Sequence, residues 1–264
     1  MKRAGYRLAV KSEWSKLRSL RSTWVSALLV LASFLALSAL FSSLSRTSSQ
    51  ATIGTYVQTT QAGELLAQFI VGVLGILVAT GEYSSGLIRS TLTSLPKRRT
   101  VLAAKATVVA CFVCALGLVS GFSSFFVALA IGTPHGLSVS ISTPGVLFAI
   151  LATGLYLAAL ALIGLGVGFV LRSTPGAVSL FVVSLLVLPL ICALLASVTS
   201  VAQTINYHLP SSLGQSLANS AGPPDPADPY SAKLISPEAA LLWLAIYTAA
   251  SSALGWLSLT RRDA

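Results

Sequence analysis

The chain has 264 residues, of which 55% are hydrophobic and 9% charged, and its formal net charge is +10. Its mean hydropathy is +0.84, and residues 106–171 and 173–224 contain no Asp, Glu, Lys or Arg, which excludes a soluble globular domain because a water-facing surface needs charged side chains. Since a charged group in the bilayer core costs about 3 kcal/mol, most of the chain is predicted to lie in lipid.

The first 23 residues are predicted to form a helix on the cytoplasmic membrane surface. Apolar and aromatic residues recur there at three- and four-residue steps, from Tyr6 to Leu20, with basic residues beside them. Glu13 falls within this apolar stripe. An ion pair with Lys16, three residues further on, is one explanation, and a contact with a cytoplasmic partner is the other. The long basic start and the spanning length of the next apolar run argue against a cleavable signal peptide.

Six apolar segments are long enough, or nearly so, to cross the hydrocarbon layer as helices, since a crossing takes about 20 residues. They are Trp24–Leu44, Leu65–Thr80, Ala106–Ile131, Gly145–Leu171, Gly176–Val198 and Ala239–Leu259. None alternates between apolar and polar residues as the strands of a membrane barrel do. The second reaches full length only by including Glu64 and Gly81. Small residues such as Gly72, Gly75 and Gly164 are predicted to let the helices approach closely.

The predicted fold class is therefore all-α: a polytopic membrane protein with six transmembrane helices. The whole chain, 1–264, is expected to form a single transmembrane domain, in which 1–23 is the interfacial helix, 24–259 the six-span bundle and 260–264 a cytoplasmic tail. Of the 17 Lys and Arg residues, all but Arg46 and Lys233 lie on one side of this arrangement. The positive-inside rule places that side, with both termini, in the cytoplasm. Membrane topology and anionic lipid explain these charges without a nucleic-acid partner.

The outer connections are predicted to be short and polar, except for the last one. Residues 45–63 and 133–144 do not look like a binding domain. Residues 199–237 begin with semi-apolar positions and continue into a Pro-rich stretch, which predicts a short interfacial or re-entrant helix followed by extended chain. A plain linker is the alternative.

The predicted spans contain almost no groups for chemistry. Acid–base catalysis and proton relays need ionisable side chains at depth, whereas all seven acids lie at span ends or outside. His208, Asp225 and Asp228 are better explained as solvated residues than as a metal or hydrolytic site. We therefore predict no catalytic residue and no metal site. If a substrate moves through these helices against a gradient, the energy is expected to come from a cytoplasmic partner, because the spans hold no proton relay and the chain lacks a P-loop motif.

The loop between the second and third spans is predicted to contain a short helix. Ser84 is a plausible cap, residues 87–95 supply an apolar face, and Pro96 ends the helix before a basic triplet. A loop that only connects two spans needs no apolar face. The apolar face of this loop is therefore a candidate contact surface through which a partner would move the spans. A basic loop that only sets the topology is the alternative.

Two stretches resemble the type-two ATP-binding-cassette (ABC) exporter permeases, in their bacterial six-span branch. They are residues 13–24 and the loop 81–89 with its ending 96–99. The resemblance implies a permease that pairs with another permease, usually a second copy of itself as a homodimer, and binds two separate cytosolic ABC ATPase subunits. Those subunits would hold ATP and Mg, and this chain would bind no cofactor.

The resemblance also implies that the first cytoplasmic loop is a coupling helix docked on the ATPase and braced by the surface helix. The residues so assigned to coupling are Glu82, Tyr83, Ser84, Ser85, Gly86, Leu87, Ile88 and Arg89, with Glu13 and Lys16 as supporting contacts.

The expected function is that of the membrane permease subunit of an ATP-driven exporter in the bacterial cytoplasmic membrane. Because the spans carry few charges, the expected substrate is hydrophobic or amphipathic; the sequence does not identify the residues that bind it. A non-transporting membrane scaffold or sensor component is the alternative. A lipid-modifying enzyme is disfavoured by the lack of acid–base groups.

Overall fold

The computed structural model describes residues 2–45, 52–84, 86, 98–133, 137–196, 199–218 and 234–261. All regular structure in these ranges is helical, which confirms the predicted all-α class. The helices are α1 Lys2–Ser19, α2 Arg21–Ser45, α3 Ile53–Thr60, α4 Glu64–Ser84, α6 Arg98–Ile131, α7 Val146–Leu171, α8 Thr174–Val182, α9 Leu188–Leu195, α10 Ser200–His208, α11 Pro210–Ala218 and α12 Pro237–Arg261, with the π-helical segment η1 Val183–Val187 between α8 and α9.

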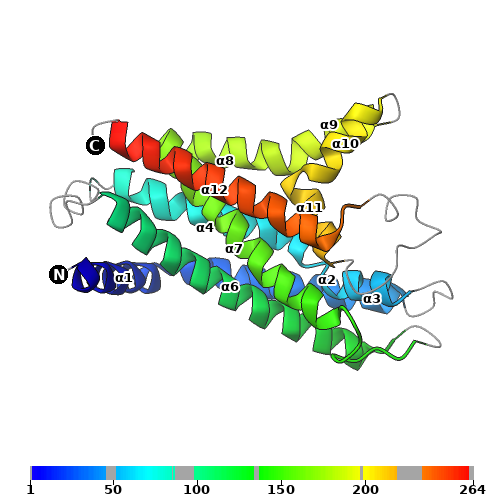
Figure 1. Ribbon diagram of the computed structural model, residues 1–264. Coiled ribbons are helices and arrows are strands. Elements are labelled where there is room, and N and C mark those ends of the chain that lie inside the picture. The colour runs from blue at the N-terminus through cyan, green and yellow to red at the C-terminus, as the bar shows by residue number, and fades with distance from the viewer. Residues whose placement is uncertain are drawn as a thin grey trace.

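Six helical segments of the described chain are long and apolar enough to cross a membrane, as predicted. They are α2, α4, α6, α7, the continuous run α8–η1–α9, and α12. The second span, which looked short from sequence, reaches 21 residues because α4 takes in Glu64 at its start and continues to Ser84. Both chain ends lie at the same end of the bundle, which we call the terminal end, while α3, α10 and α11 gather at the opposite, distal end (Figure 1).

Helix α7 is the central helix of the bundle. It packs against α4, α6 and α12. In its most apolar stretch of 18 residues, 61% of the residues are buried, compared with 17% in the corresponding stretch of the α8–η1–α9 span. Close packing against α4 depends on glycine, as the sequence predicted. A Cβ at Gly75 would collide with the backbone carbonyl of Ala161, and one at Gly164 would collide with the backbone of Gly72. Glycine therefore sets the distance between the two helices.

Helix α1 uses part of its apolar stripe to pack on α6. Ala9 and Leu17 are buried, and the rings of Trp14 and Phe112 are in edge contact with centroids 6.3 Å apart. Tyr6 also shares a hydrogen bond of 2.8 Å with Thr107 on α6. The helix ends at Ser19, earlier than the sequence suggested, and α2 begins two residues later.

The distal connections contain more helix than the sequence predicted. Residues 45–63 were expected to be a polar connection, but they include α3, whose start is stabilised by a capping box between Thr52 and Thr55. The expected short helix after residue 199 is two helices, α10 and α11. Leu209 between them is extended, as expected before Pro210, since the proline ring disfavours helical backbone in the preceding residue. The Pro-rich stretch lies outside the described residues.

Candidate functional site

Four charged side chains from three helices form a cluster at the terminal end, which we call the ion cluster. Lys105 of α6 lies between two acids, with its Nζ 2.5 Å from Oε2 of Glu13 on α1 and 3.0 Å from Oε1 of Glu82 on α4. The Nζ of Lys16 is 2.8 Å from Oε1 of Glu13 and 2.8 Å from Oε1 of Glu82. The two positive charges therefore balance the two negative charges.

The ion cluster is largely removed from water. The side chain of Lys105 is 2% exposed, those of Glu13 and Glu82 are 7% and 8% exposed, and that of Lys16 is 38% exposed. Burial by itself lowers the pKa of Lys16, but its hydrogen bonds to Glu13 and Glu82 and the charges of both acids raise it above the ordinary value of 10.5. Lys16 therefore keeps its charge at neutral pH.

The position of each charged residue within its helix explains how it reaches the ion cluster. Glu13 and Lys16 are three residues apart and so share one face of α1. Glu82 lies in the last turn of α4, and Lys105 lies near the start of α6, directly before the long uncharged segment. Glu82 at the end of α4 thus pairs with Lys105 near the start of α6, and α1 completes the cluster with its own two charged residues.

A second set of contacts ties the end of α4 to α7 and α12. The ring of Tyr83 meets that of Phe169 edge-on at 6.2 Å, and the guanidinium of Arg172 lies 5.1 Å above the Tyr83 ring. Nη2 of Arg172 donates a hydrogen bond of 3.0 Å to the carbonyl of Ser258 on α12. Arg172 also ends α7 in the left-handed conformation, with φ of 53°, which costs a non-glycine residue about 1 kcal/mol.

The structure brings together part of the predicted coupling set. Glu13, Lys16 and Glu82 are direct partners in the ion cluster, and Tyr83 adjoins it in sequence. Ser84 is the last residue of α4, and Gly86 is exposed with a positive φ of 71°. The remaining members, Ser85, Leu87, Ile88 and Arg89, lie outside the described residues. Contact of the set with an ATPase stays a prediction.

Sequence reasoning missed Lys105 as a member of this site. It was counted as a loop charge that sets topology, whereas the structure places it inside α6 with both acids as partners. The available signal was its position: Lys105 directly precedes an uncharged segment, and Glu82 directly follows another. In the described part of the chain no group of three or more His, Cys, Asp or Glu could hold a metal ion.

Comparison with known proteins identifies the family. No curated protein sequence matches the chain. A family model described as ABC-2 family transporter protein matches residues 9–187, which begin within α1, end with η1 and include the whole ion cluster. This match confirms the resemblance seen in residues 13–24 and in the loop after the second span. The chain therefore belongs to the ABC-2 family of transporter proteins.

Proposed function

We propose that this chain is the permease subunit of an ATP-driven exporter in a bacterial cytoplasmic membrane. Two cytosolic ATPase subunits would bind ATP and Mg, and a second copy of the permease would complete the transport pathway. The family, the six spans and the lack of a P-loop support this proposal. The observation that carries it is the ion cluster, because it joins three helices beside the loop that family resemblance assigns to coupling.

The terminal end would face the cytoplasm. It carries both chain ends, and its basic residues include Lys11, Arg99 and Arg172. Membrane proteins keep an excess of Lys and Arg on the cytoplasmic side, which supports this orientation. The loop between α4 and α6 would then be within reach of a cytosolic ATPase.

The ion cluster would make the ends of α1, α4 and α6 move together. Separating Lys105 from both Glu13 and Glu82 would leave a buried ammonium group without a carboxylate partner, which costs about 3–5 kcal/mol. A force on the loop after α4 would therefore move all three helix ends together. Contacts of Tyr83 and Arg172 would pass that movement to α7 and α12, and the bundle would alternate between inward-open and outward-open arrangements.

The test is a coupling measurement on the permease reconstituted with the ATPase that copurifies with it. Glu82→Gln keeps the shape of the side chain but removes one charge from the ion cluster. We expect ATP hydrolysis to continue while transport per ATP falls about tenfold, equivalent to about 1.4 kcal/mol of lost coupling. Glu238→Gln is the matched control, since Glu238 is an exposed acid at the distal end of α12 and should leave coupling unchanged.

Two results would contradict the proposal. One is a tagged chain that inserts into membranes but brings no ATPase with it, as expected of a scaffold or sensor component. The other is an inserted Glu82→Gln permease that transports as much substrate per ATP as the unmodified chain.

A further inference from the structure

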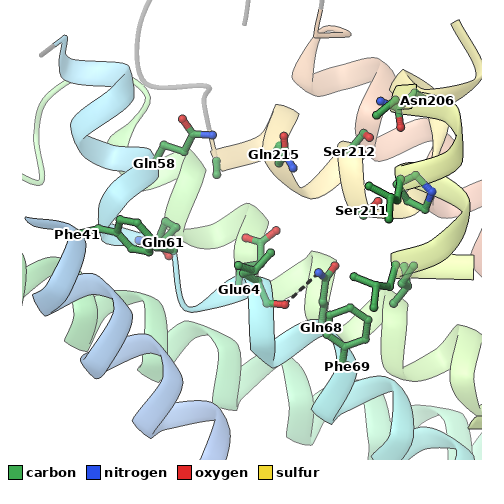
Figure 2. A pocket seen from close by; sticks show the side chains of 18 of the residues that line it. Phe41, Gln58, Gln61, Glu64, Gln68, Phe69, Asn206, Ser211, Ser212 and Gln215 are labelled. Atoms are coloured by element: carbon green, nitrogen blue, oxygen red, sulfur yellow. Dashed lines mark hydrogen bonds between the residues drawn. The ribbon is translucent and has the colours of Figure 1, made fainter. Parts of the chain in front are cut away.

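A cavity of about 610 Å³ lies at the distal end of the bundle. It is bounded by α3, the start of α4, η1, α9, α10 and α11 (Figure 2). This volume falls within the range of about 300–1,000 Å³ found for small-molecule sites. Part of the lining is apolar, including Phe69, Leu185 and Leu190, and part is polar, including Gln58 and Gln215. The cavity thus offers both an apolar and a polar surface to one ligand.

Glu64, the first residue of α4, supplies a carboxylate to this cavity. In Figure 2 the carboxylate points into the space between Gln58 on α3 and Gln215 on α11. Thr153 Oγ1 donates to Glu64 Oε2 over a long distance of 3.4 Å. Among the described residues, no Lys, Arg or His lines the cavity. The carboxylate therefore faces the cavity without a positive partner from its walls.

The acids at the two ends of the bundle differ in their partners. At the terminal end, Glu13 and Glu82 are each paired with two lysines. At the distal end, α11 packs so closely on Glu64 that a Cβ at Gly214 would collide with Glu64 Oε1. This packing restricts the position of the carboxylate beside the cavity. A partly buried acid without a basic partner favours a cation as its ligand.

The amides beside Glu64 are fixed and neutral. The hydroxyl of Tyr156 donates a hydrogen bond of 2.8 Å to Gln68 Oε1, and Gln68 Nε2 donates one of 3.1 Å to the carbonyl of Leu65. Gln61 Nε2 donates one of 3.1 Å to Thr60. The described lining therefore offers a single acidic side chain in a preorganised polar region. A single carboxylate beside a mainly apolar cavity wall suits an organic cation better than a metal ion, which takes several oxygen ligands.

We propose that this cavity binds amphipathic organic cations as substrates, with Glu64 as the counter-ion and the apolar lining as the site for the hydrophobic body. The inference rests on the proposed transport function and names the substrate class. A zwitterionic phospholipid is disfavoured because its phosphate would find no basic partner in the described lining. The cation binds between the α3–α4 junction and α11, so the distal helices determine its selectivity.

Two probes of nearly the same shape and opposite charge test this proposal. Tetraphenylphosphonium and tetraphenylborate are titrated separately against the purified full-length chain in nanodiscs. We expect tighter binding of the phosphonium, and Glu64→Gln should weaken it about 10- to 100-fold, as expected for loss of one ionic contact. Glu64→Asp keeps the charge and should keep the preference for the cation. Glu238→Gln is the control and should bind like the unmodified chain.

The outcomes separate this inference from the proposed function. Equal binding of the phosphonium by the unmodified chain and a monodisperse Glu64→Gln variant would overturn the inference. Displacement of the phosphonium by short-chain phosphatidylethanolamine would identify a lipid as the ligand and would overturn it too. If binding depends on Glu64 but ATP drives no transport, the cation site stands, while its role as a substrate site and the exporter proposal fail. If ATP-driven export proceeds without Glu64-dependent binding, the exporter proposal stands and the cation site fails.

Discussion

At the scale of single residues, Lys105 is the key member of the ion cluster. It is the most buried of the four, and it is the link between α6 and both acids. Lys16 also contacts both acids but is partly exposed, so water shares in stabilising its charge. We therefore expect the stability of the fold to depend more on Lys105 than on Lys16.

Lys105→Met is expected to destabilise the protein strongly. It leaves two buried carboxylates with Lys16 as their remaining described partner, and loss of one member of a buried ion pair costs about 3–5 kcal/mol. For a chain of this size that loss corresponds to a decrease in Tm of about 10 °C. Thermal unfolding in detergent, followed by intrinsic fluorescence, measures it.

The control for this prediction is Lys11→Met, which removes an exposed lysine of α1 and should change stability by no more than about 0.5 kcal/mol. A triple variant, Glu13→Gln with Glu82→Gln and Lys105→Met, removes both acids together with the lysine and should recover most of the lost Tm. Equal Tm values for Lys105→Met and Lys11→Met would show that the ion cluster does not stabilise the fold.

At the scale of elements, the contact between α4 and α7 determines the shape of the bundle. Helix α4 carries Glu64 at the distal cavity and Glu82 in the ion cluster, so its position against α7 fixes both sites. Close approach at Gly75 and Gly164 requires the absence of a side chain. The two candidate sites therefore share one structural support.

Gly75→Ala is expected to push α4 away from α7. Its Cβ would meet the backbone carbonyl of Ala161, which cannot move aside as a flexible side chain could, so overpacking should cost about 1–3 kcal/mol. Gly176→Ala, on the exposed start of α8, is the matched control, and helix propensity makes it neutral or slightly stabilising. Comparison of the two Tm values is the measurement, and a Gly75→Ala protein as stable as the control would contradict the predicted clash.

At the scale of the whole molecule, the prediction concerns orientation. In a chain whose native cysteines are replaced, a single cysteine at Ser140 should be labelled by an impermeant maleimide added outside intact cells. A single cysteine at Lys11 should be labelled only after the cells are opened. Both positions are exposed, and they lie at opposite ends of the bundle. We expect this orientation because membrane proteins keep an excess of Lys and Arg on the cytoplasmic side. Labelling of both cysteines from the same side would exclude the six-span topology.

Much of the fold could be predicted from the sequence because the formation of each span depends mainly on the residues within that span. Each span is a run of apolar residues that is independently favourable in lipid, and the cost of each buried charge depends little on distant residues. Helix α3 was missed because its polar composition resembles a connection, while its stability depends on the Thr52 capping box and on burial of Tyr56 and Val57. That burial exists only after α3 packs on the rest of the bundle.

The sequence by itself determined the number of spans, the side on which the basic residues gather, and the family resemblance in residues 13–24 and 81–89. Only the tertiary structure decided that Lys105 pairs with Glu13 and Glu82 while Glu64 faces a cavity without a described basic partner. The physical reason is that transfer into lipid acts on each segment separately, whereas the pairing of charges depends on how the helices rotate and how closely they approach. Those rotations and distances are set by contacts between residues far apart in the chain, such as Gly75 with Ala161.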